Sequence, residues 1–184
     1  MRAFFIALST VAFLSGCGGG GEEKADHAPA PDAAPFVNWG SLNAEQIIVP
    51  EGVTYTVSDG AARIVGVPQT AGAGGSTGGV GVRLPDSFEE QASGQQVRVT
   101  VRASSADEGA LLGAAYSTAD VGNSGWQAFV LSPEPADYTF TYSVPAMQAG
   151  NGDFLGFRSY GDDMVTVQGF RVEVVSPSES SAAP

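Results

Sequence analysis

Apolar and polar residues alternate strictly in residues 96–103, where polar side chains separate Val97, Val99 and Val101. A period of two is typical of a β-strand that buries one face and exposes the other. The same period, or a short apolar run of strand length, recurs between turn-forming residues along the chain. We predict about nine strands, at residues 54–57, 62–67, 80–84, 96–103, 111–117, 126–131, 138–144, 154–159 and 165–175.

This strand pattern restricts the fold class. About nine strands in roughly 140 residues, with no long segment of helical period, predict an all-β, antiparallel β-sandwich. A closed barrel is the structural alternative. Asp59-Gly60 predicts a hairpin turn, and only residues 86–92 begin like a helix. Because the chain has a single cysteine, the fold depends on packing and hydrogen bonding without an internal disulfide.

The N-terminus has the composition of an export signal. Arg2 precedes an apolar run over residues 3–13, and Leu14-Ser15-Gly16-Cys17 follows it. The run is too short to cross a bilayer core of about 30 Å as a helix. The four residues resemble the lipobox of bacterial lipoproteins, in which a signal peptidase cuts before the cysteine and its sulfur carries diacylglycerol. The resemblance implies a signal peptide over residues 1–16 and lipidation of Cys17. A secreted protein that merely keeps one cysteine is the alternative.

Composition divides the rest of the chain. Residues 17–35 are rich in Gly, Ala, Pro and charged side chains, which predicts a lipid anchor followed by a disordered tether. Residues 36–175 form the predicted β-sandwich domain, and residues 176–184 a disordered polar tail. In the resembling lipoproteins, Asp after the lipidated cysteine favours the inner membrane, whereas this chain has Gly18. We therefore expect lipid anchoring in the cell envelope, with the outer membrane favoured, at its periplasmic face or the cell surface.

Charge and residue content argue against several functions. A net charge of -12 should repel nucleic acids. The only histidine, His27, lies in the predicted tether, so the sandwich lacks the residues of Ser-His-Asp and Cys-His catalysis. The glycine-rich residues 71–79 lack the lysine of a phosphate-binding loop. We predict a protein that is not an enzyme. A glycoside-acting enzyme that uses carboxylates alone is the minor alternative.

No cofactor is predicted, but the sequence leaves a structural calcium ion open. Asp and Asn side chains cluster at residues 120–123, 151–153 and 162–163, and such oxygen ligands suit calcium. None of the clusters has the spacing of an EF-hand loop. Ordinary turn residues are the alternative interpretation.

Aromatic side chains at the ends of one polar loop point to a binding role. Tyr116 and Trp126 bound the loop, and alternation with Phe129 and Leu131 places Trp126 on the outer face or rim of its sheet. Such rings can stack on the apolar faces of sugars. A tryptophan that packs in the core or at a sheet edge is the alternative.

Arginines form the second candidate set. Arg83, Arg98, Arg102 and Arg158 alternate with apolar neighbours, so each should point away from the core. If they converge on one side of a sheet, they suit the carboxylate of an acidic sugar. Alternatively, they neutralise nearby Asp and Glu side chains across the strands.

Three stretches resemble the jelly-roll carbohydrate-binding modules and the wider galactose-binding-like superfamily: residues 94–103, residues 114–129, and residues 153–157 with 165–174. The resemblance implies a jelly-roll sandwich that binds saccharides without catalysis and often holds a structural calcium. Trp126, Tyr116 and the weaker candidate Tyr160 match the aromatic positions. We therefore expect a lipid-anchored envelope protein whose jelly roll binds a glycan. A structural or assembly lipoprotein that docks an envelope protein is the alternative.

Overall fold

The computed structural model describes residues 34–68, 78–118, 121–146 and 152–175. The predicted signal peptide, the lipidation site Cys17, the tether up to residue 33, residues 71–77 of the glycine-rich segment and the tail at 176–184 lie outside the described residues. None of the helices among the described residues is long and apolar enough to cross a membrane.

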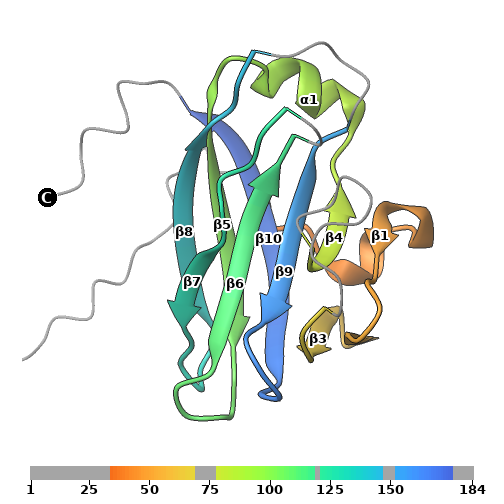
Figure 1. Ribbon diagram of the computed structural model, residues 1–184, viewed down its shortest axis with the longest axis vertical. Coiled ribbons are helices and arrows are strands. Elements are labelled where there is room, and N and C mark those ends of the chain that lie inside the picture. Colours follow the sequence, from red (N-terminus) through yellow and green to blue (C-terminus); the bar gives the residue numbers. More distant parts are fainter. Residues whose placement is uncertain (1–33, 69–77, 119–120, 147–151, 176–184) are drawn as a thin grey trace, which may run out of the picture. The chain divides into compact units, whose positions relative to one another are not determined.

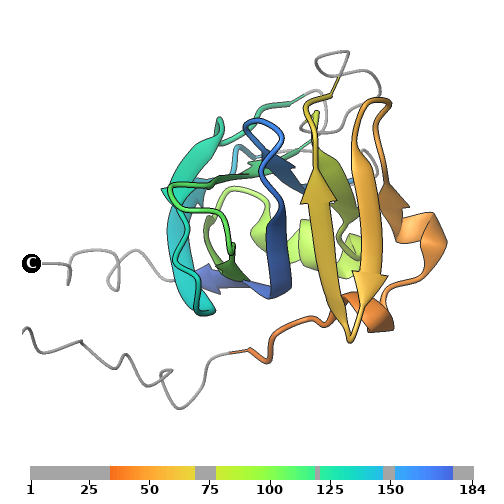
Figure 2. The same ribbon diagram turned by 90° about the horizontal axis from the view of Figure 1, so that it is seen from below.

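In the described residues, ten strands form two antiparallel five-stranded sheets that face each other (Figures 1 and 2). The front sheet has the strand order β1 (Ile47–Ile48), β4 (Val80–Arg83), β9 (Phe154–Ser159), β6 (Leu111–Ser117) and β7 (Gln127–Val130). The back sheet has the order β2 (Thr54–Ser58), β3 (Ala61–Val65), β10 (Val165–Val175), β5 (Gln96–Ser104) and β8 (Ala136–Ser143). The predicted β-sandwich is confirmed, and β1 is a strand that the sequence pattern missed because it has only two residues.

Strand register follows from the alternating pattern. In the back sheet, β5 lies between β10 and β8 and pairs with both, and Val97, Val99 and Val101 are completely buried. The predicted hairpin turn is also confirmed: Asp59 and Gly60 both have positive φ angles, and Ser58 pairs with Ala61 across the turn.

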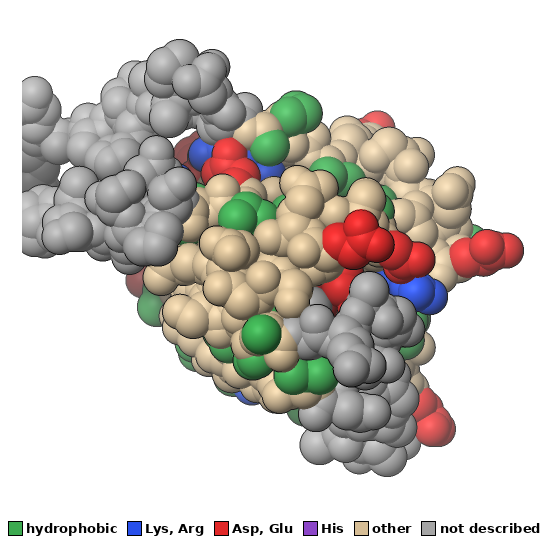
Figure 3. Space-filling view, turned by 90° about the horizontal axis from the view of Figure 1, so that it is seen from above, with side chains coloured by type: hydrophobic (Ala, Val, Ile, Leu, Met, Phe, Trp, Pro, Cys, Tyr) green, Lys and Arg blue, Asp and Glu red, His purple; other side chains and the backbone are tan. Residues whose placement is uncertain are grey.

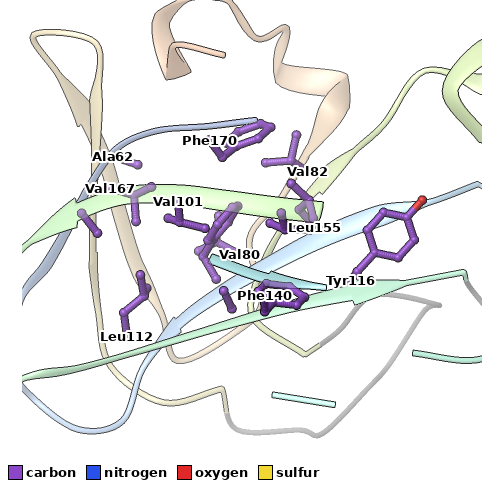
Figure 4. Packing of buried hydrophobic residues seen from close by; sticks show 14 of the residues in the cluster. Ala62, Val80, Val82, Val101, Leu112, Tyr116, Phe140, Leu155, Val167 and Phe170 are labelled. Carbon is purple, nitrogen blue, oxygen red and sulfur yellow. The ribbon is translucent and has the colours of Figure 1, made fainter. Parts of the chain in front are cut away.

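Apolar side chains of both sheets fill the space between them. Figure 4 shows Val80, Val82 and Leu155 of the front sheet close to Phe140 and Phe170 of the back sheet. Together with the neighbouring valines they form one continuous core, which fixes the position of each sheet's outer face.

Trp39 is the largest completely buried side chain, and sequence periodicity did not identify it. It begins the 3-10 helix Trp39–Ser41, which Asn38 caps by accepting a hydrogen bond from the Gly40 amide at 2.8 Å. The Trp39 ring lies 5.4 Å from the ring of Phe157 and 5.8 Å from that of Phe170, between centroids. Trp39 therefore joins one aromatic residue of the front sheet to one of the back sheet.

The predicted helical segment is α1 (Asp86–Ala92), which lies at one end of the sandwich (Figure 1). The view onto that end shows a group of acidic side chains beside a basic one (Figure 3). Asp86 and Glu90 of α1 are exposed, but Glu89 is 1% exposed and accepts a hydrogen bond from the Gly152 amide at 3.3 Å. α1 is thus attached to the segment that leads into β9.

Candidate functional site

Three predicted site residues come together on the outer face of the front sheet. Trp126 directly precedes β7, Arg158 belongs to β9, and Tyr160 directly follows β9. The guanidinium carbon of Arg158 lies 4.3 Å from the ring centroid of Trp126 and 4.3 Å from that of Tyr160. This is the geometry of a double cation–π contact. We call Trp126, Arg158 and Tyr160 the aromatic clamp.

Two glycines make room for the Trp126 ring on the sheet. Gly113 of β6 pairs with Arg158, and a Cβ atom added there would lie 3.1 Å from Cε3 of Trp126 and 3.1 Å from Cε2 of Tyr160. Gly79 precedes β4 on the other side of β9, and a Cβ atom there would lie 2.8 Å from Cη2 of Trp126. The indole therefore lies against the backbone where these strands carry no side chains.

Exposure and hydrogen bonding show what the clamp presents to solvent. Tyr160 is 39% exposed, and Trp126 and Arg158 are half-buried. The Nε atom of Arg158 is buried without a hydrogen-bond partner, and among the described residues no carboxylate lies within salt-bridge distance of Arg158. The guanidinium of Arg158 is therefore contacted by the rings of Trp126 and Tyr160 rather than by an acidic side chain. The clamp thus combines aromatic surface for stacking with donors for hydroxyl or carboxylate oxygens.

The four arginines do not converge. Arg83 and Arg158 lie on the front sheet, whereas Arg98 and Arg102 lie on β5 of the back sheet. Arg83 forms a salt bridge with Asp86 at 3.2 Å, and Arg102 forms one with Asp137 at 2.8 Å. The Arg102–Asp137 pair joins β5 to β8 and is the cross-strand neutralisation of the alternative prediction, whereas Arg83 pairs locally with the first residue of α1. Arg98 is half-buried and lies on the opposite sheet from the clamp.

Tyr116 is a core residue, which corrects its assignment as a ligand-stacking position. It is completely buried, its ring lies 5.7 Å from that of Tyr142 between centroids, and its hydroxyl donates a hydrogen bond to Asp153. Tyr116 pairs with Leu155, so it shares the inward face of the front sheet. The sequence left this open because both faces of its strand are apolar.

Asp153, also completely buried, has an altered acidity. Burial raises its pKa to about 6, the hydrogen bond from Tyr116 opposes this rise, and the nearby charge of Glu89 adds to it. Burial and the same hydrogen bond raise the pKa of Tyr116 far above its ordinary value. Neither residue reaches the surface, so this pair cannot bind a ligand from solvent directly.

The predicted calcium clusters have ordinary turn contacts where they are described. Asn123 accepts a hydrogen bond from the Gly125 amide at 2.9 Å, and the Asp163 carbonyl accepts one from the Ser159 hydroxyl at 2.8 Å. In the described part of the chain, no three acidic, histidine or cysteine side chains form a group that could hold a metal ion. Asp120 and Asn151 lie outside the described residues, and a structural calcium stays a prediction.

Comparison with known proteins finds similarity in fold alone. No protein-family model matches the chain, and no curated protein matches it. Among solved structures, the tandem CBM22-1–CBM22-2 domain of Paenibacillus barcinonensis Xyn10C has a TM-score of 0.53 at 15% identity, covering 87% of this chain and 48% of that one. The CBM22-1 xylan-binding domain of the same protein has a TM-score of 0.51 at 11% identity, covering 80% and 99%. A mutant of CBM29-2, a family 29 carbohydrate-binding module, has a TM-score of 0.50 at 13% identity, covering 81% and 95%.

Proposed function

From the fold similarity to carbohydrate-binding modules, we propose that this domain binds a glycan, without catalysis, on the outer face of its front sheet. The observation that supports this most directly is the aromatic clamp: the exposed ring of Tyr160, the half-buried ring of Trp126, and a guanidinium free of acidic partners among the described residues. Sugars offer such a surface their apolar C–H faces, while their hydroxyl oxygens accept hydrogen bonds from the guanidinium.

The second part of the proposal concerns location. We infer from the lipobox residues that Cys17 carries a lipid, which displays the domain in the cell envelope, with the outer membrane favoured. Metabolic labelling with a palmitate analogue tests this: the full chain should be labelled and Cys17→Ser should not. Equal labelling of both would overturn lipidation while leaving glycan binding open.

Glycan binding is tested on the full chain purified in detergent. The panel should include xylan, because one structural neighbour is a xylan-binding domain, together with acidic and bacterial surface polysaccharides. For the glycan that binds, Trp126→Ala should weaken affinity by about tenfold or more, because a central stacking ring is removed. Trp126→Phe, which keeps an aromatic ring, should lose less.

A matched control lies at the end of the strand that Trp126 precedes. Val130 of β7 is 65% exposed, so Val130→Ala should leave binding unchanged. Binding that survives Trp126→Ala unchanged would overturn the site. A panel without any binding, together with an envelope protein that co-purifies specifically, would favour the protein-docking alternative.

A further inference from the structure

The sheet that carries the clamp has no acidic residue in its strands, although the chain contains 20 Asp and Glu residues and has a net charge of -12. The only charged side chains of β1, β4, β9, β6 and β7 are Arg83 and Arg158. The strands of the back sheet also contain Asp137 and Glu173. Charges more than about 8 Å apart are largely screened at physiological salt, so the front sheet repels an anion less than the net charge suggests.

Arg158 differs from Arg83 in having no acidic partner. Arg83 forms its salt bridge with Asp86, but no described carboxylate lies within salt-bridge distance of Arg158, not even those of residues 162–163 in the loop after β9. The guanidinium carbon of Arg158 lies 4.3 Å from each of two ring centroids instead. Aromatic rings attract a guanidinium without neutralising it, so its positive charge remains available to an anion.

Two of the three guanidinium nitrogens of Arg158 can reach a ligand. Nε is buried without a hydrogen-bond partner in the described part of the chain. The terminal nitrogens Nη1 and Nη2 also have no hydrogen bond, but they are not buried and so retain access to solvent. A planar fork with two free terminal donors, held between aromatic rings, suits the two oxygens of a carboxylate.

These observations specify the charge of the ligand. Building on the glycan binding proposed for the clamp, we propose that the glycan is acidic and that Arg158 binds the carboxylate of a uronic acid residue. Trp126 and Tyr160 then contact the apolar C–H faces of the sugar. A neutral hydroxyl group can accept a hydrogen bond from the guanidinium, but only an anion also compensates its charge.

The test compares acidic glycans with their own neutral forms. Polygalacturonate, alginate, glucuronoxylan and hyaluronan are immobilised as sodium salts and, in parallel, after reduction of their carboxylates to primary alcohols. Reduction keeps the sugar rings and the other hydroxyl groups, so the two forms of one polymer differ chiefly in charge. The full chain in detergent should bind at least one acidic polymer at least about tenfold more tightly than its reduced form, because a charge-assisted hydrogen bond is lost.

Variants of Arg158 assign this preference to one side chain. Arg158→Gln should bind both forms with the affinity that the unmodified chain has for the reduced polymer. Arg158→Lys, which keeps the charge but not the planar fork, should retain part of the preference and remains informative if Arg158→Gln fails to fold. Arg83→Gln is the matched control: it removes the other arginine of the front sheet and should keep the full preference.

The ratio of the two affinities separates carboxylate binding from mere support of the Trp126 ring. A supporting role would weaken both forms by the same factor in Arg158→Gln, so a preference that persists in this variant would overturn the proposal. Acidic polymers that bind no better than their reduced forms would also overturn it. If neutral xylan then binds and Trp126→Ala abolishes that binding, glycan binding at the clamp stands. Binding of none of these polymers, acidic or neutral, would count against both proposals.

Discussion

The guanidinium of Arg158 and the indole of Trp126 lie 4.3 Å apart, between carbon and ring centroid, on a sheet surface flanked by Gly79 and Gly113. Neither glycine contributes a side chain to the clamp, yet both determine whether its rings can lie against the strands. The position of the ligand-facing groups therefore depends on residues that would not touch the ligand.

Gly113→Ala should displace the clamp. The added methyl group would lie 2.9 Å from Cγ of Arg158 and close to both rings, which must shift. We expect a changed tryptophan emission spectrum, weaker glycan binding and a loss of about 1–3 kcal/mol in the free energy of unfolding. Gly161→Ala is the matched control, because nothing lies within 4 Å of its added methyl group. Identical spectra and affinities for the two variants would contradict this role of Gly113.

Burial of Asp153 should make the stability of the protein depend on pH. Its pKa is about 6 in the folded protein and about 3.9 in an unfolded chain, so the folded state binds the proton more tightly. Its contribution is fully favourable below pH 4 and is lost as pH rises to 6, by roughly 3 kcal/mol. Chemical denaturation of Asp153→Asn between pH 4 and 7 should lack this decline. The same slope in both proteins would assign the pH dependence to other groups.

Tyr116→Phe isolates the hydrogen bond to Asp153. The Tyr116 hydroxyl stabilises the ionised carboxylate, so its removal should raise the pKa of Asp153 further. At pH 7 we expect a loss of about 1–3 kcal/mol, because a buried acceptor loses its donor. Carboxyl chemical shifts measured against pH report the pKa directly. Tyr142→Phe, which changes a neighbouring ring without this hydrogen bond, is the comparison. A lowered pKa of Asp153 in Tyr116→Phe would be the contrary result.

Trp39→Ala should be among the most destabilising single substitutions. The ring is 1% exposed and packs against an aromatic residue of each sheet, so a cavity would cost about 3–5 kcal/mol. Trp39→Phe should cost less, because it keeps a ring and removes an Nε1 donor that has no partner in the described structure. Urea denaturation measures both. Equal losses would mean that the indole's extra volume matters more than the ring itself.

Local patterns predicted the local structure well. Alternating valines identified β5, and Asp59-Gly60 identified the first hairpin, because both signals depend on near neighbours. Trp126 also lies on the outer face of its sheet, as alternation with Phe129 and Leu131 indicated. Which sheet each predicted arginine belongs to is instead decided by the pairing of strands that are far apart in the sequence. β5 and β9 both carry outward arginines, but nothing in either segment reveals that they belong to different sheets.

Three further places in the chain could not be assigned from the sequence. Both faces of the Tyr116 strand are apolar, so alternation could not show on which face Tyr116 lies. Its pairing with the buried Leu155 places it on the inward face. Trp39 lies in a short 3-10 helix, which is too brief to show a period. The β-bulge at Gln168, and the change of pairing partner from β3 to Val37 beside it, have no reliable local sequence pattern.

The attachment of the N-terminal segment has a mechanical consequence. The Val37 amide donates to the Phe170 carbonyl at 2.6 Å, the Phe170 amide donates to the Val37 carbonyl at 3.3 Å, and Phe36 contacts two guanidinium groups. A pulling force applied to the chain before Ala34 first reaches the hydrogen bond that the Ala34 amide donates to Glu173 Oε1 at 2.8 Å, and then these contacts, ahead of Trp39 and the core. We therefore expect residues 34–37 to separate from β10 before the tension reaches the core.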